Sequence, residues 1–315
     1  MELRTKIKFK SQQENQIDHT SKILLLGSCF SENIGQQLDY FKFNTLINPF
    51  GVLFSPTAIE KVLADTISKK EYTKAEIVQH GEVFHSLHHH SDLSALSVDK
   101  VITNIHQAQG SCLSFLKETS HVIITLGTSW VYEYLKNKEL VANCHKIPQT
   151  EFSKQILSVD EVIASLQRIV SLIQEVNPLT QIIFTVSPVR HTKDGLVENS
   201  LSKAHLLSSV ATIVKKEKGV YYYGSYEIML DDLRDYRFYE ADLIHPNKVA
   251  IDYIWEQFSH VWISEKAQAY FKRIASVQQG KLHKPFHAGS KSHQEFLEKL
   301  AVKQNELEKE LHVKF

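Results

Sequence analysis

Strong net charge and paired cysteines, two features that narrow a protein's partners and compartment, are missing from this sequence. Lys plus Arg equals Asp plus Glu, at 36 each, so no net charge draws the chain toward nucleic acid or an anionic membrane. Its three cysteines, Cys29, Cys112 and Cys144, include no C-x-x-C pair, which disfavours a disulfide framework and a zinc ribbon. We therefore expect a reducing compartment, no nucleic acid partner and a small neutral or weakly polar substrate.

Long apolar runs are also missing. None approaches the roughly 20 residues that a membrane span needs, so no membrane span is expected. The first residues, MELRTKIKFKSQQENQIDHTSK, carry charges and amides that interrupt the apolar centre of a signal peptide. The sequence therefore predicts a cytoplasmic location. With 43 % apolar and 23 % charged residues, the composition is that of a chain that folds around a core.

What is present is an alternation of short apolar segments and longer helical patterns. The apolar segments are rich in β-branched and aromatic residues, as strands covered on both faces of a parallel sheet are. We expect strands at 22–26, 43–47, 122–126, 181–186 and 220–223. Helix starts are indicated by Ser55-Pro56, by a capping box of Ser158 with Glu161, by helical spacing over 202–216 and by a pattern near Pro246 that runs past Trp255. This alternation predicts an α/β fold with a parallel sheet of about five strands.

The segments outside this alternation suggest a division of the chain. Residues 1–262 are expected to form the catalytic domain, and residues 263–315 a charged helical extension. The region 71–120 is irregular, contains the histidine-rich, hairpin-like stretch HGEVFHSLHHHS, and is interpreted as an inserted, cap-like segment over the site. A capping box of Ser292 with Glu295 opens the last helix. Its thin apolar stripe either packs back on the domain or pairs with a second copy, which would make a homo-oligomer.

Two distant motifs carry the chemistry. Ser28 follows a buried strand and Gly27, which puts its hydroxyl at the carboxyl edge of the sheet, where open α/β sheets bind ligands. Asp242 and His245 are separated by two residues ahead of a helix. An imidazole held by a carboxylate can deprotonate a serine hydroxyl, so we expect Ser28 as nucleophile, His245 as base and Asp242 as its orienting group. Cys29 is expected to be a small core residue behind Ser28.

Six ordered motifs produce a family resemblance. They are Gly27-Ser28-Cys29-Phe30, Asn48-Pro49-Phe50-Gly51, Gly127-Thr128-Ser129-Trp130, Asn143-Cys144-His145-Lys146, Ser187-Pro188-Val189-Arg190-His191 and Asp242-Leu243-Ile244-His245-Pro246. Over residues 25–258 the chain resembles the GSCFA domain family, which belongs to the SGNH hydrolase superfamily. Ser31 stands where the family name has alanine.

The resemblance implies a flavodoxin-like, three-layer α/β/α sandwich and an oxyanion hole. Ser28 matches the nucleophile, and the backbone amides of Ser28 and Gly51 match two oxyanion donors. Ser129 stands where the superfamily usually has an asparagine. Because a hydroxyl reaches less far than an amide, either Ser129 or another group such as Asn143 must supply the third donor.

The expected activity is that of a serine esterase or acyltransferase acting on a small O-acyl ester, such as an acetyl ester, of a polar or carbohydrate-like substrate. Neither a cofactor nor a metal is expected. Arg190 and His191 follow a strand at its carboxyl end and either bind substrate or form structural contacts, and the same two interpretations hold for His145. The predicted substrate-binding residues are Asn48, Thr128, Trp130, Asn143, His145, Arg190 and His191.

Two alternatives come from other functional classes. A metal-dependent hydrolase would use the histidine cluster His85, His88, His89 and His90, although adjacent histidines point apart in a strand. A non-catalytic binding protein would use the C-terminal helix as its contact surface. Hydrolysis and acyl transfer share every residue named and stay undecided.

Overall fold

The computed structural model describes residues 5–287 and 289–315 and is built around a five-stranded parallel sheet. The strand order is β10-β9-β5-β1-β2, and every neighbouring pair is parallel. These strands are β1 (Lys22–Gly27), β2 (Asn44–Ile47), β5 (His121–Leu126), β9 (Gln181–Val186) and β10 (Val220–Tyr222). All five predicted strands are confirmed, with ends within one residue of the expected positions.

The strands are apolar along their whole length because both faces of the sheet are covered. In β1, Leu24 and Leu26 pack into one hydrophobic cluster, whereas Ile23 and Leu25 pack into a second cluster on the opposite face. Successive side chains of a strand point to opposite faces, so each strand contributes to both clusters. A strand with one solvated face would instead alternate apolar with polar residues.

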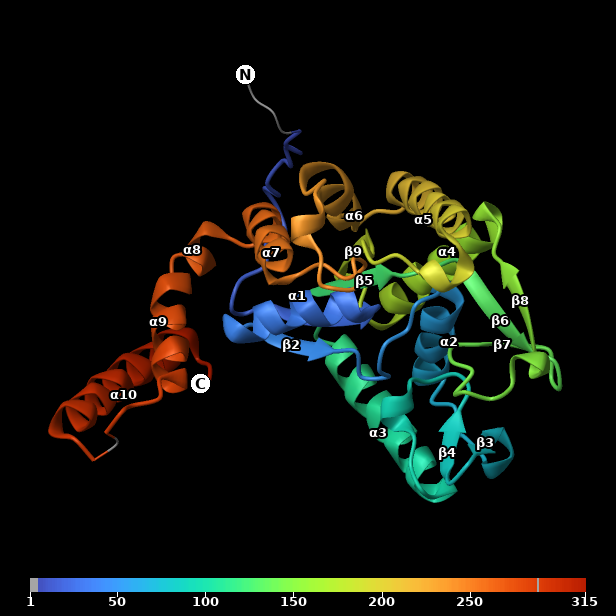
Figure 1. Cartoon of the computed structure of the whole chain (residues 1–315), viewed down its shortest axis with the longest axis horizontal. Coiled ribbons are helices and arrows are strands. Elements are labelled where there is room, and N and C mark those ends of the chain that lie inside the picture. The colour runs from blue at the N-terminus through green and yellow to red at the C-terminus, as the bar shows by residue number, and fades with distance from the viewer. Residues whose placement is uncertain (1–4, 288) are drawn as a thin grey trace.

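Helices on both faces complete a three-layer α/β/α sandwich (Figure 1). One face is covered by α1 (Cys29–Tyr40) and α7 (Lys248–Trp262), and the other by α2 (Pro56–Ile67), α4 (Val159–Val176) and α5 (Leu196–Lys216). The predicted caps of α2 and α4 are confirmed, since Ser55 and Ser158 accept hydrogen bonds from the first turns of these helices. Helix α5 begins earlier than the expected position 202. The α/β class and the five-stranded parallel sheet are as predicted.

Residues 71–120 were expected to be irregular, and this prediction is wrong for the second half of the segment. The histidine-rich stretch does form a hairpin, from β3 (Ile77–His80) and β4 (Val83–Ser86). It is followed by the long helix α3 (Val98–Leu116), whose N-cap is Ser97. Polar residues and Gly110 dilute the apolar spacing of α3, but Val101, Ile105, Cys112 and Leu116 are fully buried along one face.

A second sheet, which the sequence did not indicate, lies between β5 and α4. Strands β6 (Trp130–Tyr134), β7 (Glu139–Val141) and β8 (Phe152–Ile156) form an antiparallel sheet of order β7-β6-β8. Only one residue of β8 is buried, so the strand lacks the continuous apolar character of the central strands. These strands are stabilised by pairing with each other and by packing beside α2 and the hairpin.

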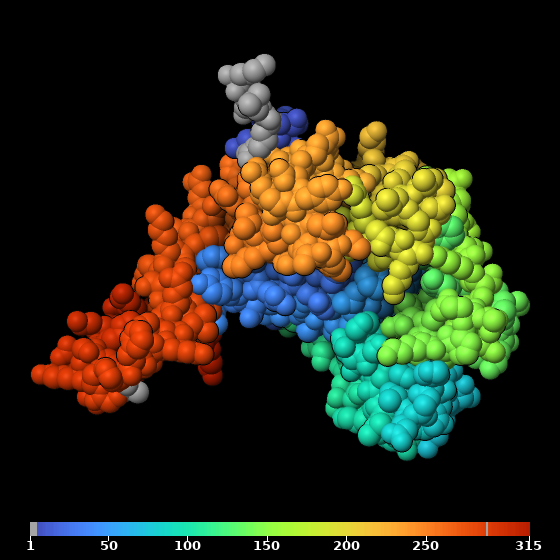
Figure 2. Space-filling model, viewed as in Figure 1, coloured from blue at the N-terminus to red at the C-terminus, as the bar shows by residue number. Residues whose placement is uncertain are grey.

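After α7 the chain leaves the sandwich through α8 (Glu265–Gln268), α9 (Phe271–Leu282) and α10 (Lys291–Leu311), of which α9 and α10 project as an arm (Figure 2). The N-cap of α10 is Ser290, not the predicted Ser292. The apolar stripe of α10 packs back on α9, where Leu307 is 1 % exposed beside Ile274 and Val277. None of the described helices has the length and apolar character that a membrane crossing requires.

Candidate active site

The strand order reverses between β1 and β5, and ligands of open α/β sheets bind at the carboxyl ends of strands at such a point. Gly27 ends β1 there with φ +126°. A Cβ at Gly27 would lie 2.2 Å from the carbonyl oxygen of Thr125 in β5, so only glycine allows this close approach. The Ser28 amide donates to the same oxygen at 3.0 Å, and α1 starts directly afterwards.

A cleft of about 450 Å³ opens at this edge of the sheet. Its walls come from the start of α1, from the ends of β5 and β9, from the second sheet and from the loop before α7. Predicted residues that line it are Thr128, Trp130, Arg190, His191 and His245. No residue of 71–120 lines the cleft, where the second sheet forms a wall, and the interpretation of 71–120 as a cap stays a prediction.

Asp242 and His245 meet on the loop before α7, as the spacing predicted. The imidazole Nδ1 lies 2.6 Å from a carboxylate oxygen of Asp242, whose other oxygen accepts the amides of Ile244 and His245 at 2.9 and 3.0 Å. These hydrogen bonds lower the pKa of Asp242 to about 2, so the carboxylate stays ionised near neutral pH. Because the Nδ1 proton faces Asp242, the other ring nitrogen is left to act as a base.

The residue at the end of β1 that lines the cleft is Cys29, not Ser28. Ser28 is 1 % exposed, and its hydroxyl caps α1 by accepting the Phe30 amide at 3.3 Å. Cys29 is half-buried and lines the cleft together with His245. The expectation that Cys29 is a core residue is therefore wrong. It assumed that strand alternation continues past Ser28, but Cys29 is the first residue of a helix.

The predicted oxyanion donors are engaged inside the chain. The Gly51 amide donates to the Asn48 carbonyl at 2.8 Å, and the Ser28 amide is held by β5. Ser129 is fully buried with its hydroxyl on Ser202, and the side-chain oxygen of Asn143 accepts the His145 amide at 2.9 Å. The amides of Ser28 and Gly51 and the hydroxyl of Ser129 therefore already have partners, and neither Ser129 nor Asn143 lines the cleft.

Asn48 is an exception among the predicted polar residues. It is 8 % exposed and has φ +40°, and within the described part of the chain neither its side-chain nitrogen nor its side-chain oxygen has a hydrogen-bond partner. A buried amide without partners costs about 1–3 kcal/mol, which a native structure usually accepts only for a reason. A donor kept for a ligand is such a reason.

The other predicted substrate residues differ in whether their side chains already have partners inside the chain. The Thr128 hydroxyl contacts Ser202 at 3.0 Å, and the indole nitrogen of Trp130 donates to a carbonyl of α5 at 3.3 Å. His191 packs its ring edge-on against Phe54, and burial lowers the pKa of His191 to about 4, so this ring is neutral in the cleft at neutral pH.

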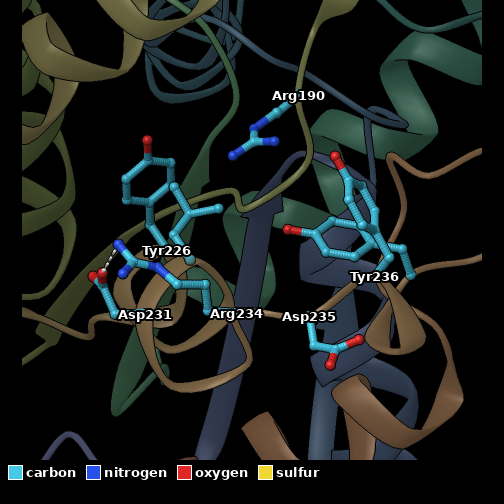
Figure 3. A pocket seen from close by; sticks show the side chains of 8 residues that line it. Arg190, Tyr226, Asp231, Arg234, Asp235 and Tyr236 are labelled. Carbon is cyan, nitrogen blue, oxygen red and sulfur yellow. Dashed lines mark ion pairs between the residues drawn. The ribbon is translucent and has the colours of Figure 1, made fainter. Parts of the chain in front are cut away.

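Arg190 links the cleft to a second pocket of about 420 Å³. Figure 3 shows its guanidinium together with Tyr226 and Tyr236, which line this pocket and belong to the segments after β10. Arg234, which lines the same pocket, pairs with Asp231 at 3.5 Å. No ion pair of Arg190 occurs among the described residues, so its five N–H donors are available to a ligand.

This arrangement can be compared with known proteins. The model of the GSCFA family matches residues 22–258, which include the sheet, the cleft and the Asp242–His245 loop. The chain belongs to the GSCFA family. A separate model, described as the GSCFA domain protein C-terminal domain, matches residues 274–315, the region of α9 and α10. No curated protein matches the chain.

Solved structures resemble this GSCFA protein at low identity. A putative platelet activating factor from Streptococcus pneumonia aligns with 12 % identity and a TM-score of 0.39 over 76 % of this chain and 83 % of that one. A family 3 carbohydrate esterase from Clostridium thermocellum aligns with 10 % identity and a TM-score of 0.35, over 82 % and 98 % of the two chains. A family 3 carbohydrate esterase from Talaromyces cellulolyticus aligns with 9 % identity and a TM-score of 0.36, over 81 % of this chain and 99 % of that one.

The histidine-rich hairpin of the GSCFA domain makes structural contacts. His85 and His89 hydrogen-bond the hydroxyls of Ser94 and Ser86 at 2.7 and 2.9 Å. The His145 ring stacks on His85 and bonds the Ser86 carbonyl at 2.8 Å, so His145 fastens the hairpin to the second sheet outside the cleft. Throughout the described residues, no three His, Cys, Asp or Glu side chains are grouped as a metal site would need.

Lys203 is a buried charged residue of the GSCFA domain, beneath the ends of β5 and β9, that sequence analysis missed. It is 1 % exposed, and its ammonium donates to the carbonyls of Gly127 and Ser187 at 2.6 and 2.8 Å, where β5 and β9 end. Burial lowers the pKa of Lys203 to about 7. A signal was present, since Lys203 stands in helical register with the apolar residues Leu206 and Val210, where a lysine is unexpected.

Proposed function

We propose that this GSCFA protein transfers or hydrolyses a small acyl group carried as an ester on a polar or carbohydrate-like molecule. The observation that carries the proposal is the imidazole of His245, held by Asp242 and lining one cleft with the start of α1. A base beside a nucleophile, at the ligand-binding edge of an α/β sheet, is the arrangement that acyl transfer needs.

The reaction is covalent and has two steps. A nucleophile at the turn from β1 to α1, where Ser28 is the residue that the family resemblance indicates, attacks the ester carbonyl. His245 takes the proton of the nucleophile and returns it to the leaving alcohol, while Asp242 stabilises the imidazolium. Water or a second hydroxyl then releases the acyl group from the enzyme.

The developing oxyanion requires donors at the same edge of the sheet. The amides at the start of α1 lie next to the nucleophile, and a helix N-terminus favours negative charge. The buried side-chain amide of Asn48 follows β2, the strand next to β1, and is the proposed side-chain donor. In this proposal these groups act as the oxyanion donors, a role for which the family resemblance had indicated Gly51 and Ser129.

The carrier of the acyl group would lie across the cleft toward the second pocket. A cleft of about 450 Å³ suits a small acyl group with part of its carrier, and Arg190 with Tyr226 and Tyr236 supplies donors and aromatic faces beyond it. Such a combination suits sugar hydroxyls or a carboxylate. His191 and Trp130 form the wall between the acyl group and the carrier.

The proposal predicts ester turnover that depends on His245. Purified protein is incubated with p-nitrophenyl acetate and with acetylated oligosaccharides, and the release of nitrophenol and acetate is measured. His245→Ala should lower kcat/KM by about 10³-fold or more, because the nucleophile loses its base. His260→Ala is the matched control, since His260 is an exposed histidine on the following helix. Equal loss in both variants, or no turnover by the wild type, would contradict the proposal and favour a binding role.

A further inference from the structure

We propose that the nucleophile of this site is the thiol of Cys29 and that the Ser28 hydroxyl is a helix cap. The inference rests on the proposed ester chemistry and names the atom that carries the acyl group. Cys29 lines the cleft that His245 also lines, whereas Ser28 is 1 % exposed and does not line it. A substrate in the cleft therefore meets sulfur at the end of β1.

The position of Cys29 at a helix start favours negative charge on sulfur as it develops during attack. Cys29 is the first residue of α1, and the backbone amides of Cys29 and Phe30 donate toward its sulfur. Amides at a helix N-terminus stabilise a thiolate as it forms. Ser28 is needed for this turn in another way, because its hydroxyl accepts the Phe30 amide and so fixes the start of the helix.

The charge of Lys203 is compatible with the same assignment. Its buried side chain lies in electrostatic range of Cys29, and two backbone carbonyls hold it in place. A buried lysine is costly, and its positive charge favours negative charge on the Cys29 sulfur as the reaction develops it. The Ser28 hydroxyl is instead buried and engaged as the cap of α1.

The resting state of the thiol follows from its surroundings. Burial raises the pKa of Cys29, Glu32 raises it further, and the amides and Lys203 lower it without cancelling the increase. The sulfur is therefore protonated at neutral pH, so the step needs a base at the moment of attack. His245 supplies it, while His191, with its lowered pKa, is a neutral wall of the same cleft.

The chemical step balances without a further reactant. The sulfur bonds to the ester carbonyl carbon as His245 takes the thiol proton, and the carbon–oxygen bond to the alcohol then breaks as the alcohol takes that proton. A thioester remains on Cys29. Water or an acceptor hydroxyl adds to the thioester and gives its proton to His245, and the carbon–sulfur bond breaks as sulfur recovers the proton.

The acyl-enzyme distinguishes the two nucleophiles. Wild-type protein is mixed with p-nitrophenyl acetate, quenched in acid and measured by intact mass, with and without neutral hydroxylamine. A thioester is cleaved by hydroxylamine at neutral pH, whereas a serine ester persists. We expect an acetyl adduct that neutral hydroxylamine removes and that maps to the peptide of residues 23–42. This measurement needs no variant and so does not depend on any variant folding.

Variants test the same assignment. Cys29→Ala should lose the adduct and at least about 10³-fold in kcat/KM, whereas Ser28→Ala should retain activity within about tenfold, since it loses only a cap. Cys144→Ala is the matched control, because Cys144 is also half-buried but lies outside the cleft. Melting curves confirm that each variant is folded.

The outcomes separate the inference from the proposed function. A hydroxylamine-resistant adduct, or loss of turnover in Ser28→Ala with retention in Cys29→Ala, overturns the assignment to Cys29 and leaves the esterase in place. Retention of full activity in both variants overturns the assignment as well. Absence of both turnover and adduct in the wild type overturns the proposed ester chemistry, and the assignment with it.

Discussion

Single residues decide which ring nitrogen of His245 is held inside the loop and which is left free of Asp242. Asp242 accepts three hydrogen bonds from the short loop that contains it, two of them from the backbone. The backbone bonds hold the carboxylate in place, and the carboxylate in turn holds the imidazole. Leu243, between the two, has φ +60°, a left-handed conformation that the tight turn requires.

Replacing Asp242 by asparagine tests this arrangement. Asp242→Asn keeps the shape of the loop but presents an amide that cannot accept the Nδ1 proton as a carboxylate does, so the wrong tautomer of His245 is favoured. We expect kcat on p-nitrophenyl acetate to fall by about 10²–10⁴-fold with little change in melting temperature. Asp252→Asn, on the exposed side of α7, is the control and should be neutral. A kcat near that of the wild type in Asp242→Asn would show that the carboxylate does not orient the base.

Among the elements, α5 connects the site to the sheet through Lys203. Its side chain reaches from the helix to the carbonyls that end β5 and β9, where no further strand residues pair. The same helix supplies Ser202, which holds Ser129 and Thr128. One face of α5 therefore holds the loops that follow β5 and β9.

The buried lysine predicts an unusual dependence of stability on pH. In the unfolded chain Lys203 has an ordinary pKa, whereas in the folded chain burial lowers it to about 7. Between these values the unfolded state binds the additional proton, so the free energy of unfolding rises with pH above about 7, by at most about 1.4 kcal/mol per pH unit from this group. This stability is lost as pH falls through the folded pKa.

Urea unfolding of wild type and Lys203→Met at several pH values between 6 and 9 measures this contribution. The difference between the two proteins should change with pH in the stated direction, because all other titrating groups are shared. Lys215→Met, an exposed lysine on the same helix, should show no such change relative to the wild type. A parallel pH dependence of wild type and Lys203→Met would mean that the buried amine does not titrate in this range.

On the scale of the whole molecule, the arm of α9 and α10 is attached to the sandwich by few contacts. Phe271 stacks on Phe41, with ring centroids 4.0 Å apart, at the base of the arm. Further out, α10 is held to α9 by the small cluster around Leu307. The division into a catalytic domain of 1–262 and an extension of 263–315 stays a proposal, in keeping with the separate family match for the arm.

A cavity in the arm should leave the site unaffected if this division is right. Leu307→Ala should destabilise α10 by about 2–4 kcal/mol, because Leu307 is the buried centre of its contact with α9. Hydrogen exchange of α9 and α10 should accelerate, with kcat unchanged. Val302→Ala, at a position that is 57 % exposed on α10, should change exchange little. A large loss of activity in Leu307→Ala would show instead that the arm supports the cleft.

The sequence by itself determined the central sheet and the loop in which Asp242 contacts His245. Strands buried on both faces must be apolar along their whole length, and a carboxylate three residues from a histidine meets it locally, so both could be predicted from neighbouring residues. The helix caps at Ser55 and Ser158 are local for the same reason. The second sheet escaped prediction because its strands are stabilised by each other and by packing beyond their own sequence.

Only the tertiary structure decided which groups face the cleft. Ser28 and Cys29 are neighbours, yet the change from strand to helix between them puts one under the helix and the other in the cleft. The Gly51 amide is taken up within its own turn and the Ser129 hydroxyl by α5, and Lys203 reaches the ends of β5 and β9 from that same helix. Burial and hydrogen-bond partners depend on segments far apart in the chain, so local pattern does not determine them.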